Sequence, residues 1–117
     1  MAQAHEHFQP ELVLSLQEQR KLRSNLEQID VAAFDANKDV LGKGVGKLDL
    51  SSFKKLATSA AIARAHWVAA AVALSDPSHT PTDPEIAHLA KLRSAYVELA
   101  EAYEAMRRMV ERGYVVV

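Results

Sequence analysis

The chain has 117 residues, the length of a single domain, and 49% of them are hydrophobic, yet 20 of these are alanine, so any core must be narrow. It contains no cysteine and is nearly neutral, with 14 basic and 15 acidic residues. This composition excludes a multi-domain enzyme and a disulfide-stapled secreted domain, and it disfavours a dedicated nucleic-acid-binding domain, which usually has a strong basic excess.

The first nine residues have neither the basic segment nor the apolar run of a secretory signal peptide. We expect residues 1–9 to be a mobile N-terminus and the protein to be cytoplasmic. The most apolar run, residues 67–74, is eight residues long. A helix needs about 20 apolar residues to cross a bilayer, so we expect no membrane partner.

Two clusters of glycine and proline divide the remaining chain into three helical segments, because both residues interrupt regular structure. The first segment starts at Pro10, which suits the first turn of a helix. Apolar residues spaced by three or four predict a helix over about residues 10–34, with a seam of Phe8, Leu12, Leu22, Leu26, Ile29 and Ala33. Val13 and Leu14 lie off this seam, so we assign them to contact with a partner.

The second helix is predicted over residues 49–75. Asp49, Ser51 or Ser52 can accept a hydrogen bond from the first helical turn, and Pro77 ends the segment. Alanine occupies nine of the 17 positions from 57 to 73, which favours a helix that its neighbours approach closely. The seam that faces another helix is predicted to contain Phe53, Leu56, Ala60, Ala63, Trp67, Ala70 and Leu74.

The third helix is predicted over residues 83–113. Asp83 is a good N-cap, Pro84 fits the first helical position, and Gly113 suits a left-handed C-terminal cap. Its seam has the regular spacing of a bundle or coiled coil and contains Leu89, Leu92, Tyr96, Leu99, Tyr103, Met106 and Val110. We expect the apolar tail of residues 114–117 to dock on the bundle or on another chain, since a free tail of this kind favours aggregation.

These elements predict an all-α fold. Residues 10–113 form one domain, a bundle of three long helices that oligomerisation completes, with a Gly/Lys-rich loop at residues 35–48. Three such rods make a slender bundle with a narrow core, and pairing two copies would cover the remaining apolar positions.

The loop at residues 35–48 carries oxygen side chains. If residues 40–45 are removed, it resembles an EF-hand calcium loop with ligands at Asp35, Asn37, Asp39 and Asp49. Six extra residues interrupt that pattern, however, and Ser52 replaces the bidentate glutamate. These departures favour a plain helix connection whose side chains accept backbone hydrogen bonds, and we predict neither metal nor cofactor.

The same loop contains Gly42–Lys47, which lacks the spacing, the preceding strand and the following Ser or Thr of a P-loop. A simpler anion site remains an alternative, because the amides at a helix N-terminus favour negative charge. Its candidate residues are Lys43, Gly44, Gly46 and Lys47.

Histidine and tyrosine side chains are the remaining candidates for a functional site. Glu85 and His88 match one Glu-x-x-His element, but a dimetal bundle needs two such elements and two further glutamates. His66 is the histidine that we expect to be half-buried. Tyr96 and Tyr103 share a helix face, where they form core or line a ligand slot. No serine lies in a nucleophile motif, so we predict that the protein is not an enzyme.

The sequence therefore favours a non-catalytic protein that works through protein–protein association, with itself or with another protein, in an adaptor, regulatory or assembly role. The predicted interface comprises Val13, Leu14, Val68, Val72, Tyr114, Val115, Val116 and Val117. Two alternatives remain: a small-ligand or anion-binding bundle that uses Gly42–Lys47, and a weak nucleic-acid accessory protein that uses Arg20, Lys21, Arg23 and the loop lysines.

Overall fold

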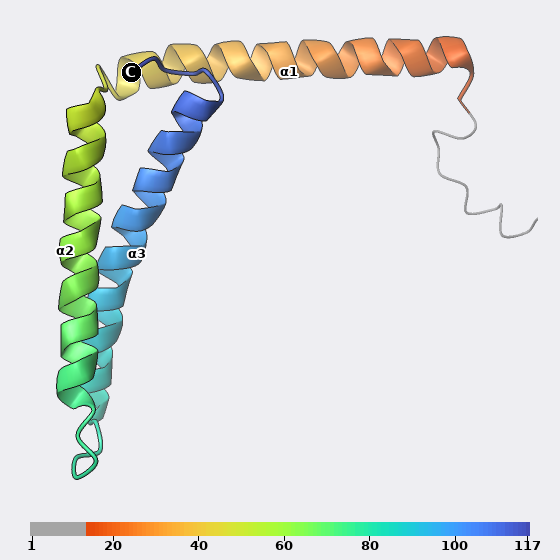
Figure 1. The fold of residues 1–117 in the computed structure, drawn as a ribbon. Coiled ribbons are helices and arrows are strands. Elements are labelled where there is room, and N and C mark those ends of the chain that lie inside the picture. Colours follow the sequence, from red (N-terminus) through yellow and green to blue (C-terminus); the bar gives the residue numbers. More distant parts are fainter. Residues whose placement is uncertain (1–13) are drawn as a thin grey trace, which may run out of the picture. The chain divides into compact units, whose positions relative to one another are not determined.

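The computed structural model describes residues 14–117. These residues form three helices, α1 (Leu16–Gly44), α2 (Leu50–Leu74) and α3 (Asp83–Glu111) (Figure 1). The prediction of an all-α fold with three long helices is confirmed. Contacts within the chain define two compact units, residues 1–40 and residues 41–117, and the second contains α2 and α3.

α1 begins with a capping box. The Glu18 backbone N–H donates to the Ser15 hydroxyl at 3.0 Å, and the Ser15 N–H donates to the Glu18 carboxylate at 3.1 Å. This exchange satisfies two amides of the first turn. The predicted start at Pro10 lies outside the described residues.

α1 runs ten residues beyond the predicted end at Phe34, so the predicted loop at residues 35–48 is corrected to a connection over residues 45–49. Gly42 and Gly44 do not stop the helix, because a glycine costs only about 1 kcal/mol relative to alanine. Local side-chain contacts support this extension of α1. The side-chain amide of Asn37 donates to the Ala33 carbonyl at 2.9 Å, and the Lys38 ammonium lies 5.8 Å from the centre of the Phe34 ring.

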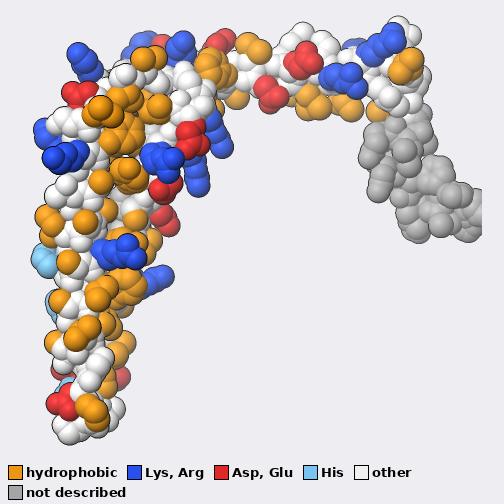
Figure 2. Space-filling model, in the orientation of Figure 1, with side chains coloured by type: hydrophobic (Ala, Val, Ile, Leu, Met, Phe, Trp, Pro, Cys, Tyr) orange, Lys and Arg blue, Asp and Glu red, His pale blue; other side chains and the backbone are white. Residues whose placement is uncertain are grey.

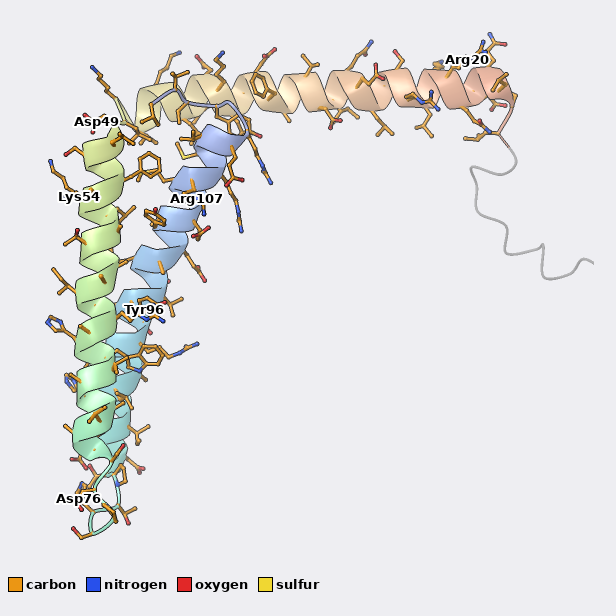
Figure 3. The ribbon with its side chains drawn as sticks, viewed as in Figure 1. Arg20, Asp49, Lys54, Asp76, Tyr96 and Arg107 are labelled. Atoms are coloured by element: carbon orange, nitrogen blue, oxygen red, sulfur yellow. The ribbon has the colours of Figure 1, made fainter. Side chains whose placement is uncertain are left out.

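α2 and α3 pack side by side as an antiparallel hairpin, with the open end at Asp49 and the turn at Asp76 (Figures 1 and 3). All seven predicted seam residues of α2 are half-buried, and we call them the inner seam. In the α3 seam, Met106 is buried, Val110 is exposed and the other five residues are half-buried. The predicted facing surfaces of the two helices are thus confirmed, apart from Val110 at the open end.

The ends of both hairpin helices are fixed by local hydrogen bonds. At the start of α2 the Ser52 N–H donates to the Asp49 carboxylate at 3.0 Å, and the Asp49 N–H donates to the Ser52 hydroxyl at 3.2 Å. α3 is capped by Thr82 rather than by Asp83, which is the first helical residue. Asp83 loses this role because Thr82 forms a capping box with Glu85.

The C-terminal end of α3 is a Schellman motif. Gly113 has a φ of 76°, the left-handed conformation predicted for it. The Tyr114 N–H donates to the Met109 carbonyl at 2.9 Å, and the Gly113 N–H donates to the Val110 carbonyl at 3.0 Å. This turn leaves Tyr114 and Val115 half-buried, while Val116 and Val117 are exposed.

Candidate association surface

Four side chains form a stacked ladder between α2 and α3. The Trp67 and Tyr96 rings stack with centroids 5.7 Å apart and planes 21° apart. The Arg64 guanidinium lies 5.6 Å from the Tyr96 centroid, and the Arg93 guanidinium lies 5.9 Å from the Trp67 centroid. A cation at each end of a π stack gains from the negative face of each ring, so the ladder joins the middles of the two helices.

A shallow groove of about 700 Å³ runs along one side of the hairpin, next to this ladder. Half of its ten lining residues are alanines, and the others are one valine, two tyrosines from α3 and one residue of each charge: Ala57, Ala60, Ala61, Arg64, Ala65, Val68, Tyr96, Ala100, Tyr103 and Glu104. Such small side chains allow another helix to approach closely. Both predicted slot tyrosines are part of the groove, and Tyr103 also contacts Phe53 edge to face at 6.2 Å.

α2 carries a second row of residues along the wall of the groove, about 120° around the helix from the inner seam. We call it the outer stripe; it consists of Leu50, Lys54, Ala57, Ala61, Ala65, Val68 and Val72. All seven are exposed, and all but Lys54 are apolar. Two apolar rows on one helix are typical of a helix that contacts more than one neighbour.

The predicted interface residues fall in three places. Val68 and Val72 belong to the outer stripe, with exposed fractions of 49% and 69%. Val116 is 88% exposed in the C-terminal tail, whereas Leu14 is half-buried and Val13 lies outside the described residues. Val68 is therefore the predicted interface residue that lines the groove, and Val72 continues the same stripe beyond it.

The predicted anion residues do not form a single loop. Lys43 and Gly44 lie in the last turn of α1, where the helix dipole is negative, and Gly46 and Lys47 lie in the connection. At the N-terminus of α2, the Asp49 carboxylate already occupies the place of an anion. Hydrogen bonds from Ser52 lower the pKa of Asp49, which keeps that negative charge in place. The geometry around these residues therefore does not favour binding of an added anion.

The calcium interpretation is corrected by the course of α1. Asp35, Asn37 and Asp39 lie within about one turn of a helix instead of wrapping an ion, and Asp49 caps α2. Successive ligands two residues apart on a helix point to opposite sides. Among residues 14–117, no group of three or more His, Asp or Glu side chains has a geometry that would hold a metal ion.

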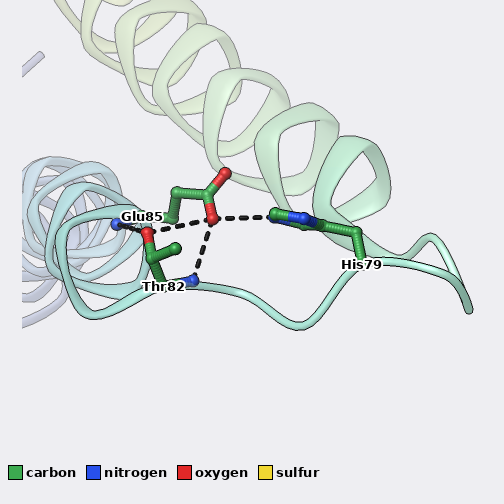
Figure 4. Close-up of polar contacts among 3 residues, drawn as sticks. All are labelled: His79, Thr82 and Glu85. Carbon is green, nitrogen blue, oxygen red and sulfur yellow. Dashed lines mark hydrogen bonds and ion pairs between the residues drawn. The ribbon is translucent and has the colours of Figure 1, made fainter.

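Glu85, half of the Glu-x-x-His element, takes part in the cap of α3 (Figure 4). Its carboxylate accepts from the Thr82 N–H at 2.9 Å and lies 2.8 Å from the His79 Nε2 atom. The Thr82 backbone N–H, then the His79 side chain and then the Thr82 hydroxyl hold the pKa of Glu85 at about 2. His66, expected to be half-buried, is exposed, because it lies on the side of α2 away from the inner seam.

α2 is also notable for its apolar composition. Among the described residues it is the one helix that is long and apolar enough to cross a membrane, with a mean hydropathy of 1.3 over 18 residues. The core helix of a soluble protein meets the same criterion, but such a helix is mostly buried, whereas only 6% of this window is buried. Charged side chains lie among the apolar ones on the hairpin (Figure 2), so a bilayer would have to accommodate those charges as well.

Comparison of the chain with known protein families, curated proteins and solved structures gives no match. The function must therefore be inferred from the surface itself.

Proposed function

We propose that the protein is a non-catalytic assembly or adaptor protein that works by self-association through the outer stripe of α2. The observation that carries this proposal is the second apolar row on α2. The inner seam is already used against α3, and the outer stripe has the same three- and four-residue spacing. A helix that presents such a row to water gains free energy when another helix covers it.

The low burial of the hairpin supports association. Met106 is the one buried residue among those described, and Ile62, Val68, Val72 and Ile86 are each about half exposed or more. A stable domain normally buries most of its large apolar side chains. A second hairpin laid against the groove would bury the outer stripe and complete a four-helix arrangement.

A protein partner fits the groove better than a bilayer or a small anion does. The groove combines alanines with Arg64 and Glu104, charges of both signs. A bilayer interior disfavours both charges, and an anion would be repelled by Glu104. A helical partner can pair with each charge at the rim while its apolar side chains rest on the alanines.

The test is the molecular mass of the full chain in solution, measured by sedimentation equilibrium over a wide concentration range. We expect reversible self-association. The variant Ala61→Asp should abolish it by placing a charge without a partner at the middle of the outer stripe. Ile62→Asp is the matched control, because Ile62 is 52% exposed on α2 but lies off the outer stripe.

Each outcome decides the proposal. Self-association that Ala61→Asp removes and Ile62→Asp leaves intact would support it. A monomer at every concentration, or equal effects of the two variants, would overturn it. Co-sedimentation of the monomer with vesicles of mixed neutral and anionic phospholipids would instead identify α2 as a membrane-binding element.

A further inference from the structure

The outer stripe of α2 is symmetric about its middle residue, Ala61. On each side of Ala61 the next stripe residues follow at steps of four, three and four positions. Going outward, Ala57 mirrors Ala65, Lys54 mirrors Val68, and Leu50 mirrors Val72. The smallest side chains are thus at the centre, and the larger ones are at both ends.

An antiparallel contact with twofold symmetry pairs residues in this way, because each residue meets its mirror residue on the other copy. If two α2 helices cross antiparallel at Ala61, Leu50 of each copy meets Val72 of the other, and alanines meet at the crossing point. The long apolar stem of Lys54 covers Val68 while its ammonium remains in water. A parallel arrangement would place Leu50 against Leu50 and Lys54 against Lys54, which brings like charges together.

The distribution of charge along the hairpin also favours an antiparallel pair. The open end, residues 47–58 and 104–112, contains six basic and three acidic residues, a net charge of +3. The turn end, residues 72–88, contains three acidic residues and no lysine or arginine, a net charge of −3. Figure 3 shows Lys54 and Arg107 towards the open end and Asp76 at the turn. An antiparallel pair places each basic end beside an acidic one.

We propose that a second copy of this chain is the occupant of the groove, with the two α2 helices antiparallel and the twofold axis at Ala61. This assignment rests on the proposed function and adds its register and direction. In this pair each α2 lies in the groove of the other copy. One wall of that groove is formed by residues 57–68 of α2, and the opposite wall is formed by residues 96–104 of α3. The alanines bring the two α2 helices close together at the centre, and the two α3 helices lie outside.

The available surface is large enough for such a pair. α2 is 25 residues long, or about 38 Å at 1.5 Å per residue. Two helices with axes 8–10 Å apart present a face about 18 Å wide, which gives about 700 Å² per copy. The total of about 1,400 Å² falls within the range of stable, specific interfaces.

The test uses single cysteines, because the wild-type chain has none. Under mild oxidation, Ala61→Cys should form a disulfide-linked dimer, since the two positions face each other at the axis. Ala57→Cys should not cross-link to itself, because its copies would lie about 12 Å apart along the helices, beyond the reach of a disulfide. A mixture of Ala57→Cys and Ala65→Cys should give the mixed dimer.

Charge variants test the direction independently. Lys54→Glu should weaken the dimer at low salt, because it brings a negative charge towards the acidic turn of the partner. Lys91→Glu changes the net charge equally but lies nearer the turn end, which faces the basic end of the partner, so the affinity of the dimer should be kept or raised. High salt should reduce the difference between the variants.

The results separate this inference from the proposed function. A dimer in which Ala57→Cys cross-links to itself, or in which Ala61→Cys does not, leaves self-association standing and overturns the antiparallel register. A chain that stays monomeric overturns both. Agreement of the three cysteine experiments with the charge pair would establish the register.

Discussion

Trp67 of α2 stacks on Tyr96 of α3, with ring centroids 5.7 Å apart and planes 21° apart. Both residues lie in the predicted seams and are half-buried, so the stack links the two helices of the hairpin directly. The flanking guanidiniums of Arg64 and Arg93 extend it at both ends. The stability of the hairpin is therefore expected to depend on these rings more than on any aliphatic pair.

A double-mutant cycle measures this link. Trp67→Leu and Tyr96→Leu should each destabilise the hairpin, and the coupling between them should be about 0.5–1.5 kcal/mol, the range for an aromatic pair. Urea unfolding followed by circular dichroism gives the free energies. Additive effects of the two substitutions would contradict an energetic role for the stack. Ile62→Leu serves as a control away from the inner seam.

The capping box of α3 predicts a cost for removing the Thr82 hydroxyl. Thr82→Ala should lower the free energy of unfolding by about 1 kcal/mol, because the Glu85 N–H then loses its acceptor. Thr80→Ala, in the same turn, should have a smaller effect. Thermal unfolding of both variants at equal concentration checks this, and equal midpoints would argue against Thr82 as the cap.

The pKa of Glu85 predicts acid sensitivity of the same turn. Its folded-state value of about 2 lies below the ordinary value of 4.5, so the carboxylate stabilises the fold fully above pH 4.5. That stabilisation is lost as the pH falls from 4.5 towards 2. The thermal midpoint should therefore decline across this window, and Glu85→Gln should show a smaller decline. NMR titration of the Glu85 carboxyl carbon measures the pKa directly.

Substitution by alanine should have opposite effects on stability at two glycines near the end of α1, Gly42 within the helix and Gly46 in the connection. A methyl group added at Gly42 meets nothing within 4 Å, so Gly42→Ala should raise helix stability by about 0.5–1 kcal/mol. Gly46 has a φ of 78°, where a side chain costs about 1–2 kcal/mol, so Gly46→Ala should destabilise the connection. Helix content and thermal unfolding by circular dichroism distinguish the two, and a loss of helix in Gly42→Ala would contradict the helical assignment of residues 35–44.

The exposed apolar tail at the C-terminus is expected to strengthen self-association. Val116 and Val117 are exposed beyond the Schellman turn, and an apolar tail lowers its free energy by docking. Deleting residues 116–117 leaves the turn intact and should raise the dissociation constant of the self-associated form. Sedimentation equilibrium against the full chain checks this, and an unchanged constant would remove the tail from the interface.

The three- and four-residue spacing of apolar side chains was sufficient to predict which faces of α2 and α3 meet, because helical periodicity is a local property. It was not sufficient at the end of α1, where clustered glycines indicated a loop. The seam in fact continues through Ala36 and Val40 with no proline to interrupt it. Ser15 and Glu18, like Thr82 and Glu85, have the capping-box spacing that would have given both helix starts.

The candidate surface was predicted only in part. Val68 and Val72 were identified because large apolar residues off a seam are conspicuous. Ala57, Ala61 and Ala65 were not assigned to the interface, since alanine suits a core, a surface and a contact equally well. The ladder from Arg64 to Arg93 depends on the register between two helices, which local spacing does not determine.

The shortage of buried side chains in the hairpin has a thermodynamic consequence. A partner that binds only the folded form shifts the folding equilibrium by mass action. For a hairpin whose one buried residue among those described is Met106, covering the outer stripe would supply much of the missing core. Folding and pairing would then be a single coupled equilibrium, and the melting temperature would rise with the concentration of the chain.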